Sequence, residues 1–185
     1  MSSTQPKHPK LVRFGTTESG AEFSDCMQWR YKLWRNWKTD GKSRIAVFCG
    51  LNPSTADSVN NDPTVTRCIR FAQRWRYTGM VMLNAYAYRA TDPDVMVAYP
   101  NPVGLHNDDA IAECTGAGHL FVVAWGSILS PKQRRQVGWD ERIAKILTLT
   151  KLTPHCLGVA KDGSPRHPLY MGSDSKPRVW RPTHG

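Results

Sequence analysis

Hydrophobic positions first follow a period of two. In residues 28–38, apolar side chains such as Tyr31 and Leu33 alternate with basic ones such as Arg30 and Lys32. This alternation is typical of a strand with one face exposed to solvent. We therefore predict a strand here whose basic face points into solvent.

A turn signal comes next. Asp40-Gly41 separates that strand from an apolar run between Arg44 and Gly50, and Asp-Gly is one of the strongest short-range hairpin signals. The pattern predicts that these two strands are antiparallel neighbours.

From residue 44 onward the pattern changes to unbroken apolar runs that alternate with stretches of helical spacing. Unbroken apolar runs are typical of buried parallel strands, and they occur at 44–50, 80–88, 120–126 and 155–160. Helices are predicted from Pro63 after an Asp62 N-cap, after Asp92-Pro93, at 107–114 and at 139–150. The alternation predicts an α/β protein, a three-layer α/β/α sandwich whose mainly parallel sheet has four to five strands.

The length of 185 residues fits one domain. Residues 1–10 are expected to be a disordered basic tail, followed by a single domain over 11–185. No run approaches the roughly 18 apolar residues of a membrane span, and the first residues lack the apolar core of a signal peptide. We expect a monomer in the cytoplasm of a bacterium or a phage-infected host.

The formal net charge of +10 suggests a polyanionic partner. Basic residues interleave with aromatic ones at 29–38 and 67–77, a mixture typical of surfaces that bind nucleic acid. DNA is the partner we expect; the alternative is that these charges only solvate a surface. The five cysteines form no CxxC pair, so we expect neither a metal nor a cofactor.

Polar residues follow each of the predicted parallel strands. Ligands of open α/β sheets bind outside the carboxyl ends of the strands, so these loops should meet at one edge. Asn84 is the sharpest case, because an amide inside the apolar run 80–88 needs hydrogen-bond partners. A structural hydrogen bond would satisfy it as well as a ligand would.

Four of these segments resemble motifs of the uracil-DNA glycosylase superfamily. They are FCGLNPST at 48–55, VMLNAYAYRA at 81–90, WGS at 125–127 and RHPLY at 166–170, and they come in the family's order. The first is closest to the mismatch-specific branch. The whole chain also resembles a family of uncharacterised phage and bacterial proteins.

The resemblance implies a uracil-DNA glycosylase-like fold and a base flipped out of DNA into a pocket. Asn52 would hold the attacking water, Asn84 would pair with the base, and His167 would donate to a base oxygen. Further base contacts are expected from Tyr86, Ser54 and Trp125. Contacts with DNA are expected from Arg30, Lys32, Lys38, Arg89, Arg166, Leu169 and Tyr170.

The chain departs from the family at two positions of the first motif. Asn52 stands where the efficient branch has an Asp, and an amide is no general base, so Asp57 or Asp62 is the candidate acid or base. Ser54 stands where that branch has a Tyr that excludes 5-substituted pyrimidines, so a larger 5-substituent is expected to fit.

The function expected from these features is that of a DNA N-glycosylase acting on a pyrimidine that can carry a 5-substituent. Three alternatives stay open. The same pocket could serve a phage DNA hypermodification enzyme that does not release the base, or a non-catalytic module that binds DNA or flipped bases. A free-nucleotide hydrolase is the last, and the lack of an acidic metal cluster and of a phosphate-binding Gly-Lys loop argues against it.

Overall fold

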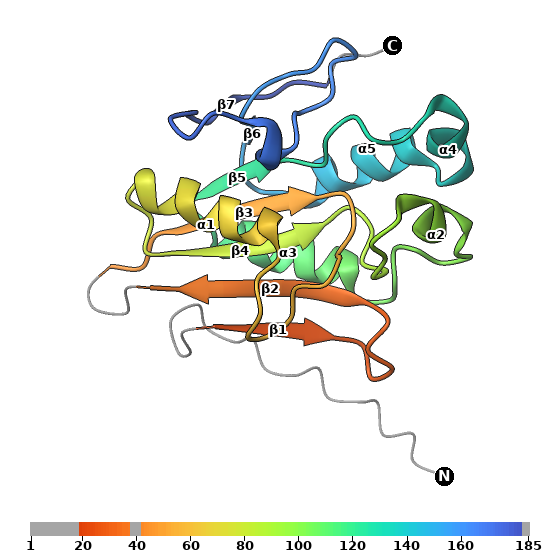
Figure 1. The fold of residues 1–185 in the computed structure, drawn as a ribbon, viewed down its shortest axis with the longest axis horizontal. Helices are drawn as coiled ribbons and strands as arrows, with labels where there is room; N and C mark the ends of the chain where they lie inside the picture. The colour runs from red at the N-terminus through yellow and green to blue at the C-terminus, as the bar shows by residue number, and fades with distance from the viewer. Residues whose placement is uncertain (1–18, 38–41, 183–185) are drawn as a thin grey trace.

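A mixed seven-stranded sheet runs through the part of the protein that the computed structural model describes, residues 19–37 and 42–182 (Figure 1). The strand order is β1-β2-β4-β3-β5-β6-β7. The four middle strands are parallel to one another, and the pairs β1–β2, β2–β4 and β6–β7 are antiparallel. The strands are β1 (Ser19–Phe23), β2 (Arg30–Asn36), β3 (Ile45–Gly50), β4 (Gly79–Asn84), β5 (Leu120–Val123), β6 (Pro154–Cys156) and β7 (Arg178–Val179).

The parallel centre of the sheet follows from the apolar runs. Every residue of β3, β4 and β5 is buried, as unbroken apolar sequence predicts for strands covered on both faces. The α/β class and the four strands of this centre are confirmed. The sheet is larger than the four to five strands expected, because β1 and β7 extend it at its two edges.

The prediction for β2 was wrong in two respects. It pairs with β1 and β4, whereas β3 lies on the far side of β4. Its basic face is also buried, with Arg30 1% and Lys32 6% exposed. Lys32 forms ion pairs with the partly exposed carboxylates of Glu22 and Glu113. The residues of the expected hairpin turn, and Lys38 with them, lie outside the described residues.

Helices pack on both faces of the sheet (Figure 1). They are α1 (Pro63–Arg74), α2 (Pro93–Ala98), α3 (Asn107–Ala117), α4 (Pro131–Gln136), α5 (Trp139–Leu149) and the 3₁₀ helix η1 (Pro168–Tyr170). One apolar cluster joins α1 to one face of β3, and the other joins α3 and α5 to the opposite face. Within 19–37 and 42–182, no helix is long and apolar enough to cross a bilayer.

Candidate functional site

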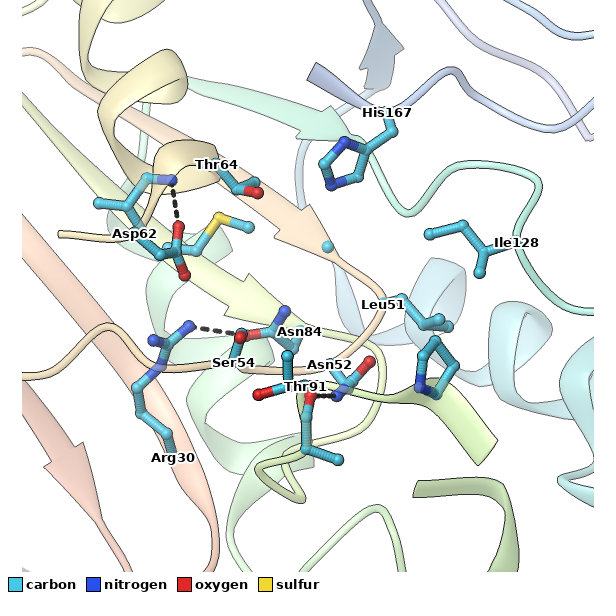
Figure 2. Close-up of a pocket in the computed structure, with 15 residues that line it drawn as sticks. Arg30, Leu51, Asn52, Ser54, Asp62, Thr64, Asn84, Thr91, Ile128 and His167 are labelled. Carbon is cyan, nitrogen blue, oxygen red and sulfur yellow. Dashed lines mark hydrogen bonds between the residues drawn. The ribbon is translucent and has the colours of Figure 1, made fainter. Parts of the chain in front are cut away.

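A pocket of about 220 Å³ lies at the carboxyl ends of β3 and β4 (Figure 2). The parallel register places Gly50 beside Asn84, the last residues of the two strands. We call this cavity the central pocket. Its lining comes from the start of β2, the β3–α1 loop, the first turn of α1, the end of β4 and the loops that follow β4, β5 and β6. The polar residues that line it are Arg30, Asn52, Ser54, Asp62, Thr64, Asn84, Thr91 and His167.

The orientation of the Asn84 amide is set by a buried arginine. Nη2 of Arg30 donates to Oδ1 of Asn84 over 3.2 Å, and an arginine has only donors, so the amide must present its oxygen to it. The Nδ2 group of Asn84 then faces the central pocket (Figure 2). A side chain at position 50 would come within 2.9 Å of this nitrogen, so Gly50 keeps the space beside it open.

Asn52 joins two of the loops that form the pocket. Its Nδ2 donates to the carbonyl oxygens of Ala90 at 2.7 Å and Pro53 at 3.2 Å. Both hydrogens of the amide are therefore used, and Oδ1 is the atom left to accept a hydrogen bond from a ligand or water. An Asp at this position would hold a carboxylate oxygen against two carbonyl oxygens, so Asn52 suits this loop better than an acid does.

His167 enters the pocket from the loop that follows β6 (Figure 2). Its Nδ1 accepts a hydrogen bond from the backbone N–H of Leu169 at 3.4 Å. Burial lowers the pKa of His167, although the nearby Asp62 carboxylate opposes the shift. The lowered pKa favours the neutral imidazole at neutral pH. Because Nδ1 accepts from Leu169, the proton of the neutral ring is on Nε2, which makes Nε2 a donor.

The motif Trp125-Gly126-Ser127 lies beside His167 at its glycine and in the core at its tryptophan. Gly126 has a φ of 78°, and a side chain there would approach Cβ of His167 to 3.1 Å. Trp125 is 2% exposed and packs edge to face against Trp139 and Trp180 in the core. The expectation that Trp125 contacts a base therefore does not fit its place in the fold.

Tyr86 is another expected base contact that lies in the core. Its side chain is completely buried, and its hydroxyl group donates to the carbonyl oxygen of Val137 at 3.1 Å. Burial raises the pKa of Tyr86 well above its usual range. An aromatic face for stacking must come from elsewhere if a base binds here.

The two candidate carboxylates are separated by the structure. Asp57 is bound by the backbone N–H groups of Val59 and Asn60, and this turn lowers the pKa of Asp57 to about 2. It does not line the central pocket. Asp62 does line it, while one of its oxygens caps α1 by accepting from the N–H of Val65 at 2.8 Å. Asp62 is thus the carboxylate that the site can use.

Arg30 places a buried positive charge at the pocket. Burial lowers the pKa of Arg30 to about 10, with Asp62 opposing the shift, so the guanidinium stays protonated at neutral pH. Among the described residues no carboxylate pairs with it directly, and its Nε is buried without a hydrogen-bond partner. A buried cation without a carboxylate partner favours a ligand that carries or develops negative charge.

The remaining residues expected to contact DNA lie outside the central pocket. Leu169 and Tyr170 are exposed on η1, directly after His167, at 45% and 78%. Arg166 is exposed and donates to the carbonyl oxygen of Val159. Arg89 lines a neighbouring pocket, and Lys32 forms the ion pairs described above.

Sequence reasoning placed Arg30 on the wrong surface and overlooked Thr64, Thr91 and Ile128. The period-two pattern assigned Arg30 to solvent because it could not show that the β3–α1 loop, through Ala56, and the side chain of Asn84 would contact the guanidinium. Thr64 lies two residues after Asp62, so its position at the start of α1 was a usable signal. Within the described residues, no cluster of three or more His, Cys, Asp or Glu side chains is placed to hold a metal ion.

Comparison with known proteins gives one result. No curated protein and no solved structure matches the chain. The model of a family described as "Protein of unknown function (DUF1643)" matches residues 30–169, a span that begins at the pocket residue Arg30 and includes His167. Since this match covers well over half of the 185 residues, the chain belongs to the DUF1643 family.

Proposed function

We propose that the central pocket binds a pyrimidine base rotated out of DNA and promotes hydrolysis of its N-glycosidic bond. The proposal extends to a fold of the uracil-DNA glycosylase type. The observation that carries it is the pair of donors, Asn84 Nδ2 and His167 Nε2–H, directed into one space beside the buried charge of Arg30. A pyrimidine ring offers carbonyl oxygens to such donors.

The charges of the pocket suit the chemistry of the bond. When the bond between the sugar C1′ and the base nitrogen breaks, its electron pair leaves with the base, which becomes an anion. The guanidinium of Arg30, acting through the amide of Asn84, and the Nε2–H of His167 would stabilise that anion as it forms. Preorganised donors of this kind commonly contribute factors of about 100 to 1000 in rate.

Two acceptors are available for the attacking water. Oδ1 of Asn52 accepts a hydrogen bond and so can orient a water molecule, and the Asp62 carboxylate can take its proton as the oxygen bonds to C1′. Asp62 then loses this proton to solvent, the base anion takes one up from solvent, and the products are the free base and an abasic sugar with a hydroxyl group at C1′. The volume of about 220 Å³ is below the range of about 300–1,000 Å³ typical of drug-sized ligands, and it suits a single ring.

The proposal is tested with oligonucleotides that each contain one uracil, thymine or 5-substituted pyrimidine, as single strands and as duplexes. Mass spectrometry of the free bases and of the strand is the readout. We expect wild type to release at least one base, and Asn84→Leu to release it at least about 100 times more slowly. A strand whose mass changes without base release would favour a modification enzyme, and binding with no change would favour a non-catalytic module; either outcome would overturn the glycosylase proposal.

A further inference from the structure

A second pocket lies against the central one. It has a volume of about 440 Å³, and its lining shares Ser54, Ala90 and Thr91 with the central pocket. Its other lining residues are Met27, Gln28, Thr55, Tyr88 and Arg89. We call it the flanking pocket. Because Ser54, Ala90 and Thr91 line both cavities, the two pockets are direct neighbours, and a ligand long enough to extend over these residues would reach both.

Arg89 is the one charged residue among those that line the flanking pocket. Its Nη1 donates to the carbonyl oxygen of Met27 at 3.1 Å, and its guanidinium lies 5.0 Å from the centre of the Phe23 ring. These contacts hold the group in place, yet its Nε is buried without a hydrogen-bond partner. In the described part of the chain, no carboxylate forms an ion pair with Arg89, so its charge is not neutralised by the protein.

Three of the other cations differ from Arg89 in this respect, whereas Arg35 and Arg44, for example, also form no ion pair within the described residues. Lys32, Arg134 and Arg142 each contact a carboxylate at 3.4 Å or less. A fixed guanidinium that lacks such a partner and faces an open cavity is the arrangement that binds phosphate.

The rest of the lining suits a sugar-phosphate backbone. Ser54, Thr55 and Thr91 supply three hydroxyl groups around the shared wall. Tyr88 is held rigid by stacking on Tyr99, with ring centres 3.9 Å apart, and by the edge of Trp29. Hydroxyl groups and a fixed cation bind phosphate oxygens, and a rigid aromatic ring packs on a sugar or base.

We propose that the flanking pocket binds the phosphodiester and sugar next to the nucleotide whose base occupies the central pocket, with Arg89 contacting the phosphate. This inference rests on the proposed function, since it takes the central ligand to be part of a nucleic-acid strand. The shortest ligand that can fill both pockets is then a dinucleotide with an intact linking phosphate. A free base or a nucleoside should bind with lower affinity.

The test measures binding of a fluorescein-labelled single-stranded thymidine trinucleotide by fluorescence anisotropy. Thr55 is exposed and makes no side-chain hydrogen bond within the described residues, so Thr55→Glu adds a carboxylate to the flanking pocket without removing a contact. We expect affinity to fall about tenfold at low salt, because the carboxylate opposes the phosphate. Thr55→Gln, of similar size, and Ser58→Glu, on the same loop outside both pockets, should stay within about twofold of wild type.

A second variant examines the cation itself. Arg89→Gln keeps a donor for the carbonyl oxygen of Met27 and removes the charge. The slope of log affinity against log salt should become shallower by about 0.7, the value for one phosphate contact on a single strand.

Three results would overturn the flanking site: no binding of the trinucleotide by wild type, equal losses in Thr55→Glu and Ser58→Glu, or an unchanged salt slope in Arg89→Gln. Failure of this proposal and of the proposed function are distinguishable, because base release and trinucleotide binding are measured separately. Base release by wild type with no effect of Thr55→Glu would remove the flanking site alone. Charge-dependent binding without any base release would support the flanking site and remove the glycosylase.

Discussion

Two buried arginines meet the end of strand β4, and they are held in different ways. Arg142 of α5 donates to the carbonyl oxygen of Ala85 and forms an ion pair with Asp108. Arg30 of β2 donates to the carbonyl oxygen of Ala56 and to the side chain of Asn84. Arg142 is 6% exposed and Arg30 is 1% exposed. The more deeply buried of the two, Arg30, has no carboxylate partner among the residues that the structure describes.

The difference separates a structural charge from a charge that serves a site. Burial of an ion costs several kcal/mol unless a partner offsets it, and Asp108 supplies that offset for Arg142. For Arg30 the only carboxylate with such an influence on its pKa is Asp62, which lines the same pocket, and the described residues form no ion pair with Arg30. The protein therefore accepts a cost in stability at the place where, in our proposal, an anionic base forms.

The largest loss of base release is expected when Arg30 is given a carboxylate partner, as Arg142 has in Asp108. Asn84→Asp places a carboxylate against the guanidinium and removes the Nδ2 donor from the central pocket. We expect base release to fall about 1000-fold, because an acceptor now faces the developing anion. The free energy of unfolding should be equal to or above that of wild type, measured by urea titration. Base release within tenfold of wild type would contradict the role given to Asn84.

Removal of the Arg30 charge should cause the next largest loss of base release. In Arg30→Met the side chain fills most of the same volume, and the Asn84 amide loses the contact that orients it. Base release should fall about 100-fold under single-turnover conditions. The substitution removes a buried charge, which favours the folded state, and two hydrogen bonds, which disfavours it. Because these effects oppose each other, the free energy of unfolding should change by only about 1 kcal/mol. A loss of stability several times larger would identify Arg30 as a structural residue like Arg142.

For Arg142 we expect a loss of stability with little change in base release. In Arg142→Met the Ala85 carbonyl oxygen keeps its hydrogen bond from Asn107, and Asp108 is partly accessible to water. We therefore expect the free energy of unfolding to fall by about 2 kcal/mol, and base release to stay within a few fold of wild type. Urea titration and the base-release assay test both parts, and a loss of base release with unchanged stability would reverse the assignment of the two arginines.

A smaller effect is expected for the pH dependence of stability, through His167. This residue lines the same pocket as Arg30. Its pKa is lowered in the folded protein, mainly by burial, from an ordinary value of about 6.5. The unfolded chain therefore binds more protons just below that pH, so stability falls as the pH is lowered through 6.5. His167→Gln should show a smaller loss of stability between pH 7.5 and 5.5. An identical pH dependence in both proteins would mean that His167 is not buried as a neutral base.

Much of the fold could be predicted from local patterns. The unbroken apolar runs located β3, β4 and β5, and Asp62-Pro63 located the start of α1, because strand burial and helix capping are determined by neighbouring residues. The two-residue strand β7 and the polar helix α4, which has no buried residue, carried no comparable periodicity.

The candidate site was predicted in part, and the division has a physical reason. Asn52, Asn84 and His167 line one pocket because parallel strands bring their carboxyl ends together, a rule that needs only the strand order. Arg30 comes from the amino end of an antiparallel strand, so that rule did not apply to it. Its part in orienting Asn84 depends on one side-chain contact across 54 positions of the chain.

The most direct test of the central claim is the single-turnover rate of base release by wild type and Asn84→Leu, on the base that wild type releases fastest. Leucine keeps the volume of the amide and removes the donor that Arg30 orients. We expect Asn84→Leu to fold with a stability within about 1–2 kcal/mol of wild type and to release the base at least about 100 times more slowly. Equal rates in the two folded proteins, or no release of any base by wild type, would contradict the central claim.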